Sequence, residues 1–234
     1  NFMKKIILQS FLCVFAFQFV YAQTEKRSTS ELNSKFHAVF SAGAAVPVGN
    51  FGKKNPDVTT EAGLARLGYN LAVNAGYQFT DRMGLASSLY YSRFKLDQKA
   101  IDDYLKNVGS GVTTTPDHWQ YFGLVVGPMA SFSIAKDVSF DFKAMGGVAH
   151  ANMPVFKFEV EGLPIANATT KEHWAYSFAW QLGTGLRYNF APGVCFCANI
   201  DYNFMKPTWS VENFGDFNQK MGVMDFNVGI GATF

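Results

Sequence analysis

Residues 174–190 read WAYSFAWQLGTGLRYNF, and the alternation within this stretch determines the expected fold. Large apolar side chains occupy every second position from Trp174 to Phe190 and are interrupted only at Thr184. The positions between them carry Ala, Ser, Gln, Gly, Arg and Asn. Because successive side chains of a β-strand point to opposite faces of the sheet, this period of two predicts a strand with one large apolar face and one small, polar face.

Three further segments repeat the pattern, at residues 67–79, 194–204 and 224–234. Alternation by itself is also typical of a soluble sheet. The second face is more informative, since its small and polar residues suit a narrow interior behind a face of rings and aliphatic side chains. No apolar run after residue 22 approaches the ~20 residues that a spanning helix needs. A membrane location therefore requires a closed barrel, in which every backbone group finds a partner within the protein.

The spacing of turns gives the number of strands. Short turns fall at Thr80-Asp81-Arg82, Ala135-Lys136-Asp137 and Ala191-Pro192-Gly193, and long irregular stretches fall at 47–64, 96–117, 151–172 and 207–220. Each short turn joins two strands, and strands at 36–46 and 221–234 complete a set of eight. We therefore predict an all-β fold, a closed antiparallel up-and-down transmembrane β-barrel with short turns at one end and long loops at the other. Side chains fill the interior of so small a barrel.

Composition agrees with a membrane barrel and excludes one class of partner. Aromatic residues make up 16% of the chain and charged residues also only 16%, where a soluble domain carries roughly 25% charged residues. Without Lys4 and Lys5, the 20 basic residues become 18, against 18 acidic ones. This balance provides no basic surface of the kind that binds nucleic acid, so no nucleic-acid partner is expected.

The N-terminal residues predict an exported protein. Lys4 and Lys5 precede the apolar stretch 6–20, and Val20-Tyr21-Ala22 places small residues where a signal peptidase cleaves. We expect residues 1–22 to be a signal peptide cleaved between Ala22 and Gln23, residues 23–35 to be a short periplasmic segment, and residues 36–234 to form the barrel. The apolar stretch is too short for a membrane anchor, which is the competing interpretation.

The signal peptide, the stretch AAVPVGNF at 44–51, the hairpin spacing and the terminal Phe234 together resemble the small outer-membrane β-barrel family, of the OmpX and OmpA-barrel kind. The resemblance covers the whole mature chain and implies an integral protein of the bacterial outer membrane, in contact with outer-membrane lipid. It also implies that Phe234 is part of the signal read by the barrel-assembly machinery. It does not specify activity, because the family includes adhesins, structural anchors and lipid-modifying enzymes.

Several charged residues occupy positions that alternation places inside the barrel. Charges in a narrow interior are costly unless they are paired, and an arginine can bind two carboxylates at once. We therefore expect a luminal ionic network around Arg187, and the alternative is that each charge is hydrated near a barrel end. The residues of this network are Arg187, Asp201, Asp225, Asp141 and Lys143.

A second group of residues is expected at the membrane–water interfaces, where amphipathic rings prefer to lie. Its members are Trp119, Trp174, Tyr176, Tyr188 and Phe190. His118 and His173 directly precede two of these residues and are assigned to the same girdle. An external metal or hydrolase site is the alternative for the two histidines.

Two cysteines and His150 are the other candidates for chemistry. Cys195 and Cys197 lie two apart on a strand and point to the same luminal face; we interpret them as small filling side chains, with a redox or metal pair as the alternative. A lipid esterase built from His150 with Ser133 or Asp141 matches no motif. No zinc-type spacing occurs, so no metal or cofactor is expected.

Three functions remain open from the sequence. The first is a non-enzymatic barrel with an envelope-structural role, or with a surface-interaction role in which the loops 47–64, 96–117, 151–172 and 207–220 contact an unknown partner. The second is an outer-membrane lipid-modifying enzyme, and the third is a soluble lipocalin-like carrier. Within the loops, residues 101–108 after Asp97 are expected to form a short helix, and residues 157–161 to extend a hairpin beyond the membrane.

Overall fold

The computed structural model describes residues 35–54, 62–107, 112–160, 168–169, 173–211 and 215–234. The expected signal peptide, its cleavage site between Ala22 and Gln23, and residues 23–34 lie outside the described residues.

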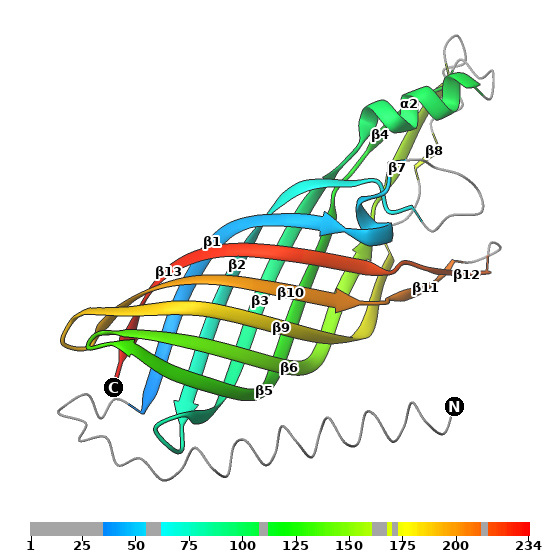
Figure 1. The fold of residues 1–234 in the computed structure, drawn as a ribbon. Helices are drawn as coiled ribbons and strands as arrows, with labels where there is room; N and C mark the ends of the chain where they lie inside the picture. The colour runs from blue at the N-terminus through cyan, green and yellow to red at the C-terminus, as the bar shows by residue number, and fades with distance from the viewer. Residues whose placement is uncertain (1–34, 55–61, 108–111, 161–167, 170–172, 212–214) are drawn as a thin grey trace, which may run out of the picture. The chain divides into compact units, whose positions relative to one another are not determined.

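Eight long strands form one closed sheet in the order β1-β13-β10-β9-β6-β5-β3-β2, and every neighbouring pair is antiparallel (Figure 1). The predicted eight-stranded barrel is thus confirmed. The strands of the barrel are β1 (Phe36–Val48), β2 (Ala65–Gln78), β3 (Met83–Leu96), β5 (Trp119–Ala135), β6 (Val138–Met153), β9 (His173–Ala191), β10 (Val194–Met205) and β13 (Met221–Thr233).

The ring closes where the first and last strands meet. Ser41 of β1 lies opposite Ala72 of β2 on one side and opposite Gly229 of β13 on the other. At the end of this seam, Phe36 N donates to Phe234 O at 3.1 Å and Phe234 N donates to Phe36 O at 2.8 Å. The barrel therefore has no free strand edge, which is the condition for strands to cross a bilayer.

The three predicted short turns are confirmed, and they lie at the same end of the barrel as Phe36 and Phe234 (Figure 1). In the first turn, the Thr80 hydroxyl accepts the backbone N–H of Met83 at 3.0 Å. In the third, Gly193 has a φ of +75°, a left-handed conformation that costs glycine little.

The four long connections lie at the opposite end and carry structure of their own. They contain η2 (Gly49–Gly52), α2 (Gln98–Asn107), a sheet of β4 (Val112–Pro116), β7 (Phe156–Val160) and β8 (Ala168–Thr169), and a hairpin of β11 (Thr208–Val211) and β12 (Gly215–Asn218). The expected helix at 101–108 is α2, which starts three residues earlier. Among the described residues, no helix has the length and apolarity needed to cross a membrane.

The start of α2 has a local cause. Asp97 precedes the helix, and its Oδ1 accepts the backbone N–H of Ala100 at 3.4 Å, as an N-cap residue does. Gln98 Nε2 then donates to Thr114 O at 2.6 Å, which joins the helix to β4. The expected hairpin at 157–161 is represented by β7, which pairs with β4 and β8.

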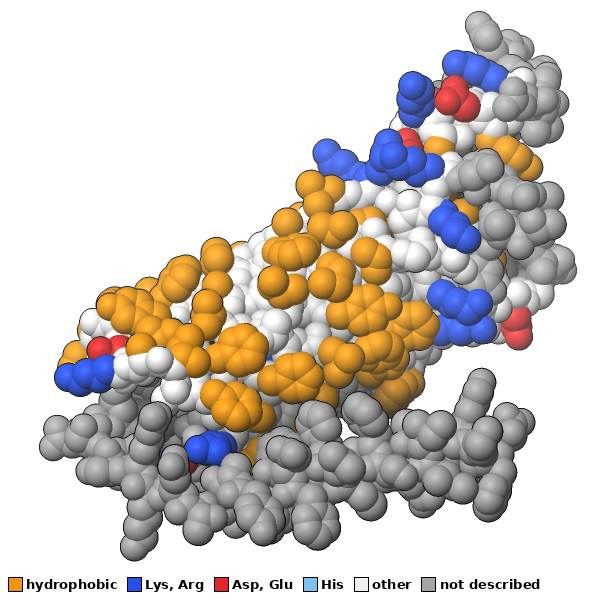
Figure 2. Space-filling model, viewed as in Figure 1, with side chains coloured by type: hydrophobic (Ala, Val, Ile, Leu, Met, Phe, Trp, Pro, Cys, Tyr) orange, Lys and Arg blue, Asp and Glu red, His pale blue; other side chains and the backbone are white. Residues whose placement is uncertain are grey.

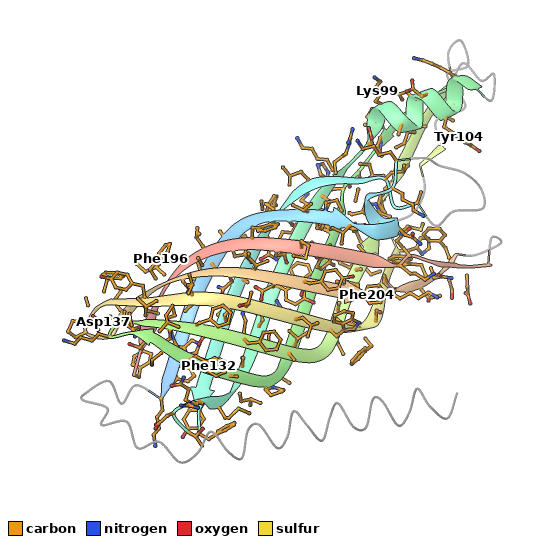
Figure 3. The ribbon with its side chains drawn as sticks, in the orientation of Figure 1. Lys99, Tyr104, Phe132, Asp137, Phe196 and Phe204 are labelled. Atoms are coloured by element: carbon orange, nitrogen blue, oxygen red, sulfur yellow. The ribbon has the colours of Figure 1, made fainter. Side chains whose placement is uncertain are left out.

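The two faces of the barrel differ sharply in chemistry. Exposed large apolar side chains cover the outside as a band (Figure 2), which includes Phe132 and Phe196 in Figure 3. The buried side chains of the same strands include Ser, Asn, Gln, Asp, Lys and Arg residues. A soluble carrier would have the reverse distribution, because water would meet its outer face and an apolar ligand its inner one. An apolar exterior around a polar interior is the distribution of a transmembrane β-barrel.

Glycines in the wall allow long side chains to cross the narrow interior. A Cβ at Gly123 would overlap the ring of Tyr90, and a Cβ at Gly183 would overlap the carboxylate of Asp201. At Gly183 the same Cβ would also lie 3.0 Å from Cε of Lys143. The glycines on inward positions therefore provide the space that the luminal side chains occupy.

Candidate functional site: the lumen and the loop end

Arg187 lies at the centre of a group of polar side chains near the short-turn end of the lumen. Its Nη2 lies 3.4 Å from Asp141 Oδ1 and donates to Ser131 Oγ at 3.3 Å, and Ser131 donates in turn to Asp141 Oδ1 at 2.5 Å. On the opposite side, Arg187 Nη1 donates to His37 Nδ1. All four side chains are buried. The guanidinium thus spans the interior from β6 to β1.

The other expected members of the network form two separate contacts. Lys143 Nζ lies 3.2 Å from Asp201 Oδ1, and both side chains are buried. Asp225 accepts a hydrogen bond of 2.7 Å from Asn203. All five predicted residues therefore lie inside the barrel, but of the three aspartates only Asp141 contacts Arg187.

Asp201 and Asp225 lie directly opposite each other in the pairing of β10 with β13. Two carboxylates in this relation repel each other, and the repulsion is partly offset by Lys143 on one and Asn203 on the other. Asp225 Oδ1 has no hydrogen-bond partner among the described residues. The middle of the lumen therefore carries an excess of acidic groups.

His37 is the member that the sequence analysis did not identify. It occupies the first inward position of β1, and its ring lies where a Cβ at Gly76 would be. The alternation of β1 would have placed it inside the barrel, but it gives no indication of its partner. That partner, Arg187, is 150 residues away in sequence.

Four of the five expected interfacial aromatics face outward. Trp174 and Tyr176 lie near the loop end, where Tyr176 is 76% exposed and both rings contact the imidazole of His150. Tyr188 and Phe190 lie at the short-turn end, with ring centroids 6.4 Å apart. The two pairs therefore lie near opposite ends of β9, which is where aromatic side chains are expected if β9 crosses the membrane from one interface to the other.

The assignment of Trp119 to this girdle is wrong. Trp119 is only 4% exposed and points into the barrel, as Tyr121 and Val125 of the same strand do. Phe122 and Leu124, which alternate with them, face outward. Its indole N–H donates to Gly63 O at 2.8 Å, so the one polar atom of the ring is satisfied inside the protein. A buried tryptophan needs such a partner.

Trp119 belongs to a cluster that we call the aromatic plug, formed by Phe51, Phe94, Trp119 and Trp209. These residues come from η2, β3, β5 and β11 and are all buried. Trp119 lies 5.7 Å from Phe51 and 5.7 Å from Trp209, and Phe51 lies edge-on to Phe94 at 5.2 Å. Trp209 Nε1 donates to Ala151 O at 3.1 Å. Rings from four separate elements thus fill the interior at the loop end.

The remaining candidates do not assemble a reactive centre. Cys195 and Cys197 are buried free thiols, and the described residues contain no group of three His, Cys, Asp or Glu side chains that would hold a metal. His150 faces outward opposite Phe122, whereas Ser133 and Asp141 lie nearer the short-turn end of the same sheet. His150 and Asp141 are nine residues apart on one strand, about 30 Å. The esterase combination that matched no motif is therefore not brought together by the fold.

The two remaining histidines lie at the loop end. His118 Nδ1 lies 2.9 Å from Asp117 Oδ1 and 3.2 Å from Arg93 Nη2. The hydrogen bond from His118 lowers the pKa of the exposed Asp117 carboxyl below its usual value. His173 is the first residue of β9, half-buried, and lies opposite Met153.

A closed antiparallel ring, an apolar outer band and a side-chain-filled polar interior define the class of protein: an eight-stranded transmembrane β-barrel. No protein-family model matches the sequence, and no curated protein matches it significantly.

Solved structures with a similar fold are small outer-membrane β-barrels. The attachment invasion locus protein Ail of Yersinia pestis is 17% identical, with 86% of this chain and 99% of Ail covered and a TM-score of 0.44. Neisserial surface protein A is 16% identical, with 87% and 100% covered and a TM-score of 0.47. The outer membrane protein OprG of Pseudomonas aeruginosa is 12% identical, with 86% and 97% covered and a TM-score of 0.44. Similarity at this level carries no information about what this chain binds.

Proposed function

We propose that this protein is a non-enzymatic integral barrel of the bacterial outer membrane, with an envelope-structural or surface-interaction role. The observation that carries the proposal is the continuous band of exposed apolar side chains around a closed ring with a charged interior. Exposed apolar area of this extent is tolerated only against lipid or another protein. The short turns then face the periplasm and the long loops face outward, as in barrels of this class.

The lumen is proposed to be filled and not to act as an open pore. Two features support this. Across the short-turn half, Arg187 contacts side chains from β1, β5 and β6, and the Lys143–Asp201 ion pair joins β6 to β10. At the loop end, the aromatic plug occupies the interior. An ion entering from either side would have to displace paired charges or buried rings, both of which are costly.

The loop end offers the surface for a partner. The sheet of β4, β7 and β8 and the helix α2 extend beyond the barrel (Figure 1), and α2 exposes Lys99 and Tyr104 (Figure 3). The Gln98–Thr114 hydrogen bond holds α2 against β4, and the Arg66–Asp97 ion pair joins the start of α2 to β2 of the barrel, so these elements present a defined surface. We propose that an external partner contacts this extension.

Phe234 is proposed to act during assembly more than in the finished barrel. It is 69% exposed and its ring lies 5.9 Å from that of Phe36. The backbone of residue 234 closes the seam by hydrogen bonds to Phe36, whereas the side chain contacts the Phe36 ring and is otherwise largely exposed. An exposed terminal ring is accessible to the barrel-assembly machinery.

Two measurements test the proposal. Native protein extracted from membranes is run with and without boiling in dodecyl sulfate, and a closed barrel should migrate differently in the two samples. Purified protein in a planar bilayer should show no steady conductance. Equal mobility would contradict the closed membrane barrel, whereas a persistent open channel would contradict only the filled lumen.

A further inference from the structure

Two cysteines of β10, Cys195 and Cys197, point into the lumen near the short-turn end; the third cysteine of the chain, Cys13, belongs to the expected signal peptide. Phe196 between them faces outward and is 44% exposed (Figure 3), whereas Cys195 is 0% and Cys197 6% exposed. The two side chains pack with Val39 in a small cluster of their own. Their thiols are in hydrogen-bonding contact. The inner wall therefore carries a buried dithiol.

The extended backbone disfavours a disulfide between the two sulfurs. Residues two apart on a strand have Cα atoms about 6.6 Å apart, which is near the upper limit of about 6.8 Å that a disulfide spans. Cys195 and Cys197 are also paired with β9 on one side and with β13 on the other. The strand therefore cannot contract without losing backbone hydrogen bonds. The pair is expected to remain two thiols, with their sulfur atoms close enough to hold one small ion between them.

Unpaired polar atoms lie on the strand beside the dithiol. Arg187 is directly opposite Cys197, and Asn189 is directly opposite Cys195, so these side chains lie within contact distance. The Nη atoms of Arg187 bind the polar group described above, but its buried Nε has no hydrogen-bond partner among the described residues. Asn189 Oδ1 is likewise buried and has no partner there. A buried N–H beside two thiols indicates a ligand state in which a sulfur accepts a hydrogen bond, as a thiolate does.

We propose that Cys195 and Cys197 bind one soft monovalent cation, copper(I) or silver(I), between their two sulfur atoms. Thiolate ligands select soft ions of this kind. Two ligands suffice for these ions, whereas a structural zinc site needs four. The proposal therefore agrees with the finding that the described residues contain no group of three metal-binding side chains. It rests on the closed barrel and not on the function proposed above.

Binding exchanges two S–H bonds for two metal–sulfur bonds. One monovalent cation and two thiols give a complex with a single negative charge, and two protons leave to the solvent; no electron is transferred. Arg187 Nε then donates a charge-assisted hydrogen bond to the Cys197 thiolate. The guanidinium lies between this complex and the Asp141 carboxylate, so that the new buried negative charge is next to a cation.

The test measures silver bound by folded, membrane-extracted protein in nonionic detergent and chloride-free buffer. Cys195→Ser and Cys197→Ser each remove one sulfur and keep a side chain of similar size. Met145→Leu is the matched control, because it removes another buried sulfur of the barrel at nearly constant volume. Each protein is reduced, freed of reductant, incubated with silver nitrate and desalted in the presence of excess free methionine as a competitor.

Bound silver is counted by elemental mass spectrometry, and released protons are counted by titration at constant pH. Boiled and unboiled samples on a gel establish that each variant has folded. Wild-type protein and Met145→Leu should retain one silver ion per chain and release two protons for each ion. Each serine variant should bind silver about 100-fold more weakly, since losing a residue that only supports a metal ligand already costs roughly 10- to 100-fold.

Two results would overturn the inference while leaving the barrel and its proposed function intact. The first is equal retention of silver by wild-type protein and both serine variants, which would show an adventitious ion only. The second is binding that appears only after the protein is unfolded in urea, because the thiols of the folded barrel would then be inaccessible to the ion.

Discussion

Replacing Arg187 by methionine keeps most of the side-chain volume and removes the cation that contacts Asp141 among the described residues. Within the described part of the chain, the change leaves the buried Asp141 carboxylate with the Ser131 hydroxyl as its remaining side-chain partner, and it leaves His37 Nδ1 without its Arg187 donor. Breaking a buried ion pair in this way costs about 3–5 kcal/mol. Because Ser131 still donates to the carboxylate at 2.5 Å, we expect a loss near 3 kcal/mol, at the lower end of this range.

Two further variants separate the ion pair from other effects of the substitution. Leu186→Ala changes the adjacent residue, whose side chain points outward, and removes up to three carbons from lipid contact, which amounts to about 2 kcal/mol at most. Asp141→Asn removes the negative charge but preserves the shape of the side chain. If the pair is responsible, Arg187→Met/Asp141→Asn should be less destabilised than the sum of its two single changes by about 1 kcal/mol or more.

The free energies of unfolding are measured by urea titration of each variant in lipid vesicles, followed by tryptophan fluorescence. We expect Arg187→Met to be more destabilised than Leu186→Ala, and the double variant to lose less stability than the sum of its two single changes. If Arg187→Met unfolds at the same urea concentration as wild type, the luminal charges are hydrated individually and there is no stabilising ionic network around Arg187.

Four shorter predictions follow from the same structure. Gly183→Ala should destabilise the barrel by about 1–3 kcal/mol in urea titration, because the added methyl overlaps the Asp201 carboxylate; an unchanged midpoint would show that Asp201 moves freely. Trp209→Ala removes one ring of the aromatic plug and should produce channel openings in planar bilayers that wild type lacks; a silent variant would mean that the remaining side chains suffice to close the lumen. Deleting Phe234 should lower outer-membrane abundance with little change in the stability of inserted protein; wild-type abundance at native expression would exclude an assembly role. The intact mass of membrane-extracted protein should begin at Gln23, and a mass that retains residues 3–22 would refute the cleavage site.

The strands were predictable because each of them alternates over most of its length. The segment 174–190 lies within β9, and the turns at residues 80–82 and 191–193 contain residues whose backbone preferences favour chain reversal. Both signals are local. Alternation and turn residues can therefore be recognised in a single sequence, and they determine the number of strands and which face of each strand points inward.

Contacts across the lumen were not predictable from these signals, because they depend on the stagger between strands. Alternation places Arg187, Asp141 and Asp201 inside the barrel but does not give their heights along its axis. The register pairs Arg187 with Ser139 and Asp141 with Gly185, which brings the guanidinium diagonally to Asp141. It also places Asp201 opposite Asp225, a repulsive relation that sequence spacing does not indicate. A shift of two residues in either pair would preserve every inside–outside assignment and change every partner.

The errors at the loop end have a different physical cause, which is that the contrast between the two faces is lost there. Near the membrane centre the outer residue is apolar and the inner one small or polar, so residue type reports the face. At the loop end both faces of β5 carry rings, Trp119 and Tyr121 inside and Phe122 outside, and residue type no longer distinguishes them. The bulge at Arg66 adds a residue to one strand only, which reverses the phase on one side of it. The aromatic plug also lies in this region. The part of the barrel that meets headgroups and loops is therefore where its specific properties are concentrated and where alternation predicts least.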